Sequence, residues 1–224
     1  MSKLRRRVGS PSKTKKLMLN ADVLTFQEFV MHEPLPLSKI QKAILEFLQG
    51  RDDAVLFGAQ AVNAYVSEPR MTQDVDILST RAKALAEELR EYLSEKFHIA
   101  VRVREIAEGK GFRIYQVRSE GNRHLADVRS ITETPETETI ENLQVLAPLD
   151  LIASKVISYH SRRGNPKSGT DWRDIGVLLI RFPELKEKVL GSLKSKNVSD
   201  WVIETWKSIE RQDFRAEDDE DLSF

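Results

Sequence analysis

The chain has 224 residues with 35 Lys and Arg and 35 Asp and Glu, so its formal net charge is zero and no overall field draws it to nucleic acid or membrane. It contains no cysteine, which excludes disulfides, thiolate metal sites and a cysteine nucleophile. No apolar run approaches the roughly 20 residues that cross a bilayer, and the basic N-terminus lacks the apolar segment of a secretory signal, so we expect a cytoplasmic protein without a membrane partner.

Charge gathers at the two ends of the chain. Residues 1–16 carry seven basic side chains and no acidic one, and residues 217–221 are all acidic. Blocks of like charge are usually solvated, so we expect a flexible basic head over 1–20 and an acidic tail over 214–224. Contact of the head with nucleic acid and pairing of head with tail are the alternatives.

Apolar periodicity predicts mixed helices and strands up to residue 147. A first helix spans 37–48, with Ser38 as its N-cap and Gly50 as the residue that ends it. A later helix, capped by Ser79 or Thr80, runs to 96. The other expected elements are strands over 54–57, 75–78, 99–106, 112–117 and 125–128, a short helix over 59–66, and turns at 109–111 and 120–122.

These elements predict a mixed sheet that is flanked by helices and has an antiparallel meander on one edge. The helix that ends at 96 presents Leu85, Leu89 and Leu93 as its inner stripe. The fold class is therefore α/β or α+β.

The second half of the chain reads almost entirely as helix. A polar, threonine-rich connection over 132–139 and a short strand over 143–146 come first. Pro148 suits the first turn of a helix that runs to about residue 160. A basic loop follows over 161–169, and then helices over 170–180, 184–195 and 199–210. We expect an α/β domain over 21–147 and a helical domain over 148–213, without internal repeats.

Two acidic residues mark the strand over 75–78. Because successive side chains of a strand point to opposite faces, Asp74 and Asp76 share one face. Paired carboxylates suit Mg²⁺, which takes substrate phosphates among its remaining ligands. Asp127 is a lone acid inside an apolar strand, so it is either the third carboxylate of a two-metal site or one half of a buried salt bridge. The pattern indicates a protein that handles a nucleotide.

The turn at Gly58 and Ala59 lies where a strand meets the start of a helix. Backbone N–H groups at such a turn favour phosphate, so Gly58 either cradles phosphates or serves a tight turn. Arg70 lies just before the acid pair, where it either clamps phosphate or pairs with Asp74. Thr72 lies in the same segment.

The segment from Gly58 to Tyr65, followed by Arg70, Thr72 and the Asp74-x-Asp76 pair, resembles the active-site signature of the nucleotidyltransferase superfamily. That superfamily shares its core with DNA polymerase β. The sequence is most similar to the AbiEii/AbiGii toxin-like branch. The signature covers about twenty residues, and a weaker similarity extends it over more than half of the chain.

The resemblance implies a Mg²⁺-dependent enzyme with an NTP as substrate. Asp74, Asp76 and Asp127 would hold two metal ions, and Asp127 would also help to deprotonate the acceptor hydroxyl. Gly58, Ala59, Arg70, Thr72 and Lys155 would bind the nucleotide. Many members have Gly-Gly or Gly-Ser where this chain has Gly58-Ala59. Lys155 interrupts an apolar helix face, so a snorkelling lysine is the competing interpretation.

The remaining polar residues carry weaker predictions. Asp171 and Asp174 resemble part of the family pattern, although Trp172 and Arg173 interrupt it, and a capping or packing role on their helix is expected. The four histidines have no metal-ligand spacing, and ordinary surface or core positions are expected for them: His32, His98, His124 and His160.

Three functions remain open on the sequence alone. The leading hypothesis is transfer of NMP from an NTP to a hydroxyl of RNA, protein or a small molecule, in a toxin–antitoxin or resistance role with an antitoxin as partner. The second is a catalytically inactive binding module of the same fold, suggested by Ala59 and the charged ends. The third is a metal-dependent phosphohydrolase that uses water as its acceptor.

Overall fold

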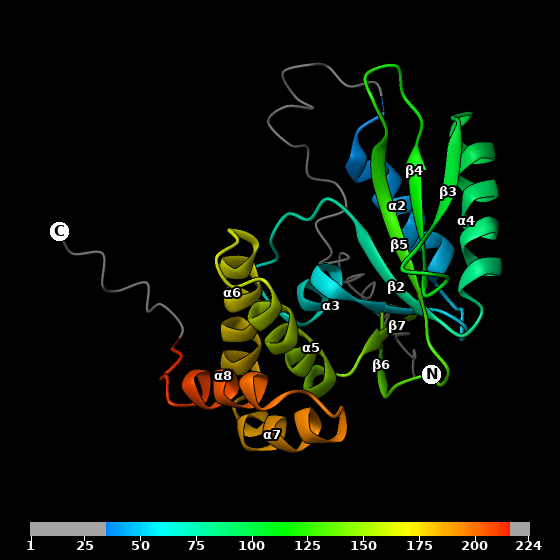
Figure 1. Cartoon of the computed structure of the whole chain (residues 1–224). Helices are drawn as coiled ribbons and strands as arrows, with labels where there is room; N and C mark the ends of the chain where they lie inside the picture. The colour runs from blue at the N-terminus through cyan, green and yellow to red at the C-terminus, as the bar shows by residue number, and fades with distance from the viewer. Residues whose placement is uncertain (1–34, 216–224) are drawn as a thin grey trace, which may run out of the picture.

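A seven-stranded mixed β-sheet runs through the computed structural model, which describes residues 35–215 (Figure 1). The strands are β1 (Val55–Phe57), β2 (Val75–Ser79), β3 (Val101–Ile106), β4 (Gly111–Gln116), β5 (Arg123–Ser130), β6 (Thr137–Ile140) and β7 (Leu143–Leu146). The helices are α2 (Leu37–Leu48), α3 (Gly58–Tyr65), α4 (Ala82–Phe97), α5 (Pro148–Ser161), α6 (Lys167–Arg181), the short 3₁₀ helix η1 (Pro183–Leu185), α7 (Lys186–Ser195) and α8 (Asp200–Glu210).

The strand order is β3-β4-β5-β2-β1-β7-β6. Strands β3, β4 and β5 form the antiparallel meander at one edge, and β5 then pairs with β2 in parallel. Strand β1 is antiparallel to β2 and parallel to β7, and β6 closes the other edge as the antiparallel partner of β7. The predicted fold class, a mixed sheet with a meander on one edge and flanking helices, is confirmed.

Helix α4 covers one face of the meander, and α2 packs against α4. The predicted inner stripe is confirmed, since Leu85, Leu89 and Leu93 are fully buried against the sheet. The C-terminal helices gather around α5, which contacts α3, α6, α7 and α8 (Figure 1). Trp206 on α8 is fully buried among them. Burial of such apolar faces is the main force that holds both groups of elements together.

Several local predictions are wrong, among them the Ser79 or Thr80 cap of α4, whose N-cap is Arg81 without a side-chain cap hydrogen bond. The polar segment over 132–139 contains strand β6, because its alternating threonines suit an edge strand and Thr137 donates a hydrogen bond to Gln144 of β7. Ser38 does not cap α2, since Pro36 occupies that position and Ser38 is buried inside the helix. The basic loop is shorter than expected because α6 begins at Lys167. Gly50, by contrast, ends α2 with a φ of +74°, as predicted.

The predicted basic head over 1–20 lies outside the described residues, and so do residues 216–224 of the predicted acidic tail. Among the helices of residues 35–215, none is long and apolar enough to cross a membrane.

Candidate active site

Strand register brings the predicted carboxylates together. In the parallel pair of β2 and β5, Asp76 is the direct partner of Asp127. On its other side, Asp76 is the partner of Phe57, the residue before Gly58. Asp74 lies immediately before β2, two positions from Asp76. Asp76 and Asp127 therefore lie in paired positions on β2 and β5, and Gly58, the first residue of α3, directly follows the end of β1.

Gly58 lies close to the side chain of Asp76. Its φ is +70°, in the left-handed region that favours glycine. A Cβ built on it would lie 2.1 Å from Asp76 Oδ2 and 2.8 Å from Asp76 Cγ. The glycine is thus the residue that allows the Asp76 carboxylate to lie against the start of α3. Ala59 follows it as a buried residue of the same helix.

Crowding of negative charge perturbs Asp76. Burial, followed by the nearby charge of Asp74, raises the pKa of Asp76 to about 6, and the charge of Asp127 adds to this. Arg129 opposes the shift, but its Nη2 approaches Asp76 Oδ1 only to 3.9 Å. A carboxylate whose charged form is opposed by burial and by neighbouring negative charge favours the binding of a cation.

Asp127 has close cationic partners on the sheet itself. Arg113 of β4 donates Nε to Asp127 Oδ1 at 2.7 Å and Nη2 to Oδ2 at 2.8 Å. His124 lies 3.0 Å from the same Oδ1 through its Nε2. Burial alone would raise the pKa of Asp127, but the hydrogen bonds from His124 and Arg113 lower it to about 2. The alternative interpretation of Asp127, a buried salt bridge, is therefore observed, although the position beside Asp76 is that of the predicted third acid.

His124 was expected in an ordinary position, and that prediction is wrong. Its Nδ1 lies 3.4 Å from Asp74 Oδ2, while its Nε2 contacts Asp127. Asp74, His124 and Asp127 each offer one ligand atom within 4.8 Å of the others. Burial alone would lower the pKa of His124, but the hydrogen bond to Asp127 and the charges of Asp127 and Asp74 raise it.

A local irregularity in the pairing of β4 with β5 sets the position of His124. Residues 124 and 127 are three apart, so regular alternation would put them on opposite faces of β5. The pairing of β4 with β5 shifts register at Ile114 and Tyr115, where Tyr115 pairs with His124 instead of Leu125. Such a bulge re-aims side chains, and here it brings the imidazole onto the side of Asp127.

Two buried aspartates of α6 form ion pairs with Lys155. It is 6% exposed, and its Nζ donates to Asp174 Oδ2 at 2.7 Å and lies 3.8 Å from Asp171 Oδ1. Asp171 also accepts a hydrogen bond from Arg162 at 2.8 Å. The expected capping role of these two acids is wrong, because α6 begins at Lys167. The packing alternative fits better, since both acids are buried, where they form ion pairs. The snorkelling interpretation of Lys155 is wrong for a side chain so fully buried.

Arg70 joins the same group of charges. Its Nε and Nη2 each donate to the Asp174 carboxylate at 2.8 Å, so Asp174 takes the place of Asp74 in the ion pair that was one of the two alternatives for Arg70. Burial alone would raise the pKa of Asp174, but the hydrogen bond from Arg70 and the charge of Lys155 hold it below its ordinary value. Thr72 donates its hydroxyl to the backbone carbonyl of Asp74 at 3.2 Å. Arg70 and Thr72 therefore brace the segment that leads into Asp74.

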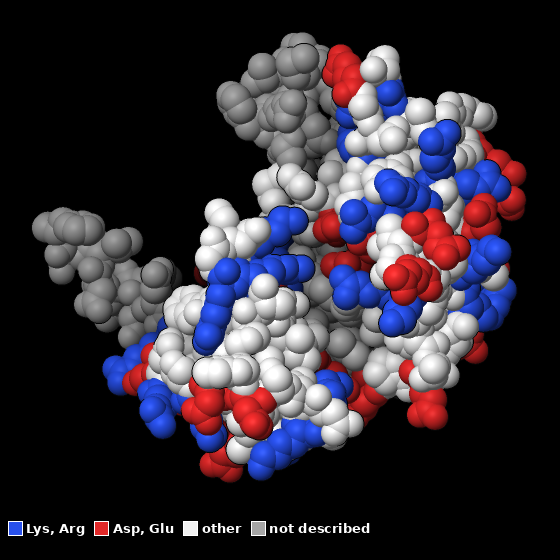
Figure 2. All heavy atoms as spheres, viewed as in Figure 1, with Lys and Arg blue, Asp and Glu red and all other residues white. Residues whose placement is uncertain are grey.

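One cavity joins the sheet to the helices at this point. It has a volume of about 220 Å³ and brings together three of the predicted residues, Gly58, Asp76 and Lys155. The other residues that line it are Phe57, Arg129, Ser154, Ile157, Ser158, Arg162 and Asp171. Figure 2 shows Lys and Arg side chains bordering the recess between the sheet and the helical part, with acidic side chains inside it. A phosphate chain with a bound cation matches this mixture of charges.

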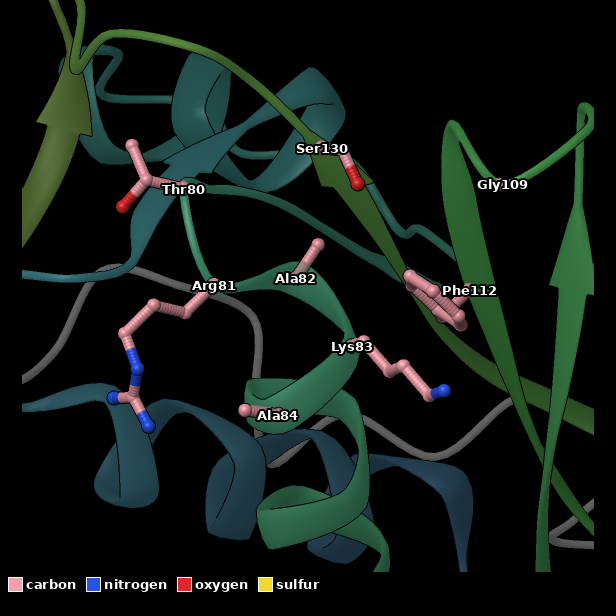
Figure 3. Close-up of a pocket in the computed structure, with 8 residues that line it drawn as sticks. All are labelled: Thr80, Arg81, Ala82, Lys83, Ala84, Gly109, Phe112 and Ser130. Atoms are coloured by element: carbon pink, nitrogen blue, oxygen red, sulfur yellow. The ribbon is translucent and has the colours of Figure 1, made fainter.

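A second cavity of about 400 Å³ lies at the start of α4 (Figure 3). It is lined by Thr80, Arg81, Ala82, Lys83, Ala84, Gly109, Phe112 and Ser130, and it includes none of the predicted site residues. Arg81 and Lys83 extend to opposite sides of the helix start, and Arg81 is engaged by Asp53 and Glu88. This cavity has no carboxylate in its lining, so we assign the site to the smaller one.

Sequence reasoning missed four members of the site: Arg113, His124, Arg129 and Arg162. Arginines in strands are common on solvated faces, so nothing in the local pattern marked Arg113 or Arg129. The one usable signal was the predicted pairing of 112–117 with 125–128, which sets the Arg113 side chain opposite Asp127.

Residues 42–222 match the family described as "Nucleotidyl transferase AbiEii toxin, Type IV TA system", which confirms the resemblance to that branch. Among curated proteins, none matches this sequence significantly. The fold is similar to the Megavirus polyadenylate synthase, with a TM-score of 0.56 and 13% identity over 76% of this chain, although the match spans 40% of that protein. It is also similar to JHP933 from Helicobacter pylori, with a TM-score of 0.53 and 14% identity over 84% of this chain and 90% of that one.

Proposed function

We propose that this chain, which belongs to the AbiEii family of nucleotidyl transferases, moves a nucleoside monophosphate from an NTP to an acceptor hydroxyl. The acceptor oxygen would form a bond to the α-phosphorus, and the bond to the leaving oxygen would break, so that pyrophosphate departs and the hydroxyl loses its proton. The observation that carries the proposal is the shared cavity of Gly58, Asp76 and Lys155, with Asp74 and Asp127 beside it.

The carboxylates fit a divalent metal. Asp74, Asp76 and Asp127 offer hard oxygen ligands from adjacent positions, and burial together with the charges of Asp74 and Asp127 raises the pKa of Asp76. We assign Mg²⁺ to Asp74 and Asp76, with Asp127 as the third carboxylate of a two-metal site. When bound, the metal would neutralise charge that develops on the phosphate.

The residues of the cavity would hold the triphosphate. The Lys155 ammonium, fixed by Asp174, supplies a positive charge in the cavity that Asp76 also lines. Gly58 and Ala59 open α3, so their backbone N–H groups lie at a helix start, which favours phosphate. This binding role rests on the helix start and on the close approach that glycine permits.

We assign to Arg70 and Thr72 a supporting role, in which they hold other residues of the site in place without contacting the nucleotide. Because the Arg70 guanidinium is engaged with Asp174, we assign it to positioning Lys155 and not to direct clamping of phosphate. Asp127, with a pKa of about 2, is a weak proton acceptor near neutral pH, so we assign it to holding metal and not to deprotonating the acceptor.

We further propose a division of labour between the α/β part, residues 21–147, and the helical part, residues 148–213. The first carries the carboxylates and the second carries the lysine, so the nucleotide lies where they meet. The family points to a toxin–antitoxin setting in the cytoplasm, with RNA, protein or a small molecule as acceptor and an antitoxin as partner.

The test is transfer of label from each α-labelled NTP in the presence of Mg²⁺, with total RNA and cell extract as acceptors. Wild type should label one acceptor class, Asp76→Asn should not, and Asp52→Asn, a change at an exposed acid, should behave as wild type. Release of free NMP without an acceptor would favour the phosphohydrolase. Absence of transfer, together with absence of Mg²⁺-dependent NTP binding, would overturn the proposal in favour of a binding module.

A further inference from the structure

We propose that His124 is a metal ligand, and that Asp74, His124 and Asp127 form a mixed oxygen–nitrogen site for a divalent transition cation such as Mn²⁺. This inference rests on the proposed function, because it names the cation that would occupy the second position of the metal site. It adds a nitrogen donor to a set that the sequence assigned to carboxylates alone.

The separation of the donor atoms fits one cation. One atom from each of the three residues lies within 4.8 Å of the other two, and His124 Nε2 is 3.0 Å from Asp127 Oδ1. Metal bonds to oxygen and imidazole nitrogen are about 2.0–2.2 Å long, so two ligands on one ion are roughly 3–4.4 Å apart. Small side-chain shifts therefore bring the three atoms onto one ion.

The ligand types decide which cation is favoured. Mg²⁺ and Ca²⁺ take oxygen ligands, and Mg²⁺ usually keeps several of its water ligands when it binds to a protein. Imidazole suits first-row transition metals, and carboxylate also suits Mn²⁺. Two carboxylates with one imidazole therefore favour Mn²⁺ or a similar cation over Mg²⁺ at this position.

The sheet holds the imidazole ready for this role. The register shift between β4 and β5 puts His124 beside Asp127, and the Tyr115 ring lies against the imidazole with a centroid distance of 5.7 Å. Arg113 also holds the Asp127 carboxylate through two hydrogen bonds, one to each carboxylate oxygen. Partners of this kind orient metal ligands and tune their affinity. A bound cation would share Asp127 with Arg113.

The experiment uses the full chain with Mn²⁺ alone and no nucleotide. Electron paramagnetic resonance of free Mn²⁺ gives the dissociation constant, and electron spin-echo modulation detects a coordinated imidazole nitrogen directly. Wild type should show the nitrogen modulation. His124→Gln should lose it and bind Mn²⁺ at least about tenfold more weakly, the lower end of the loss seen when even an outer partner is removed. His98→Gln changes an exposed imidazole away from the carboxylates and should match wild type.

Failure of this inference is separable from failure of the proposed function. Bound Mn²⁺ without nitrogen modulation in the wild type, equal affinity in His124→Gln, or no Mn²⁺ binding at all would each overturn it, even if Mg²⁺-dependent transfer occurs. Conversely, nitrogen modulation that depends on His124 would support it even if no acceptor takes up label. The wild-type signal decides the matter should His124→Gln fail to fold.

Discussion

Replacement of Gly58 with alanine tests how closely the Asp76 carboxylate is set against the start of α3. The added Cβ would lie 2.1 Å from Asp76 Oδ2, and ordinary van der Waals contact begins at 3.4 Å, so the carboxylate must move by about 1.3 Å. Displacement of a catalytic group by about 1 Å can cost on the order of 100-fold in rate. The φ of +70° adds a backbone cost of roughly 1–2 kcal/mol for an L-residue.

We therefore expect Gly58→Ala to lose about 100-fold or more in kcat and about 1–2 kcal/mol in the free energy of unfolding from the backbone alone. Label transfer measures the first quantity and urea denaturation the second. Gly191→Ala is the matched control, since nothing lies within 4 Å of its added Cβ. Alanine is favoured over glycine inside a helix such as α7, so this variant should keep its activity and gain up to about 1 kcal/mol in the free energy of unfolding.

A double variant separates the clash from the backbone cost. Asp76→Gly removes all three of the crowding atoms, Oδ2, Cγ and Cβ. In that background, Gly58→Ala should cost only the backbone contribution to stability. A Gly58→Ala enzyme with the wild-type rate would refute the reasoning, and so would an equal loss of stability with and without the Asp76 side chain.

Three further predictions concern the buried charges. Asp174→Ala should lower the free energy of unfolding, measured in urea, by about 3–5 kcal/mol because Arg70 and Lys155 lose their shared partner; Arg90→Ala, in an exposed pair, should stay within about 0.5 kcal/mol. Because the folded-state pKa of Asp174 is lowered, its stabilisation is present above the unfolded pKa near 4 and is lost as pH falls through the folded value. Below about pH 4, the free energy of unfolding of wild type, measured in urea, should therefore fall more steeply with decreasing pH than that of Asp174→Asn. Equal slopes of the two curves would contradict this. Lys155→Met should raise KM for the NTP while circular dichroism stays unchanged, and an unaltered KM would remove Lys155 from the nucleotide site.

Most of the sheet could be predicted because its signals are local. Short apolar runs bounded by Gly or Asn turns gave the strands of the meander, and the leucine stripe gave the buried face of α4. Gly50 ended its helix as a residue with positive φ should. Strand β6 was missed because it is an edge strand with polar residues on both faces, so neither alternation nor hydrophobicity marked it.

The site was predictable where it depends on one strand and not where it depends on several. Asp76 and Asp127 could be placed on strands, but their direct pairing required the parallel register of β2 with β5. The partner of Arg70 is Asp174, which is 104 residues away in the sequence, and no local sequence pattern predicts a contact between residues so far apart. His124 depended on a bulge, which strand alternation cannot anticipate.

The charges around Asp174 link the position of Lys155 to that of Asp74. Arg70 lies in the segment that enters β2 at Asp74, and it shares the Asp174 carboxylate of α6 with Lys155 of α5. Buried ion pairs add little net stability compared with apolar side chains of similar volume. Their directional hydrogen bonds, however, fix where charged groups lie. An apolar replacement could hold α5 and α6 together equally well, but it could not hold an ammonium group at a set place in the cavity that Asp76 also lines. Under the proposed function, we therefore attribute the burial of charge at this junction to the placement of Lys155 and not to the stability of the fold.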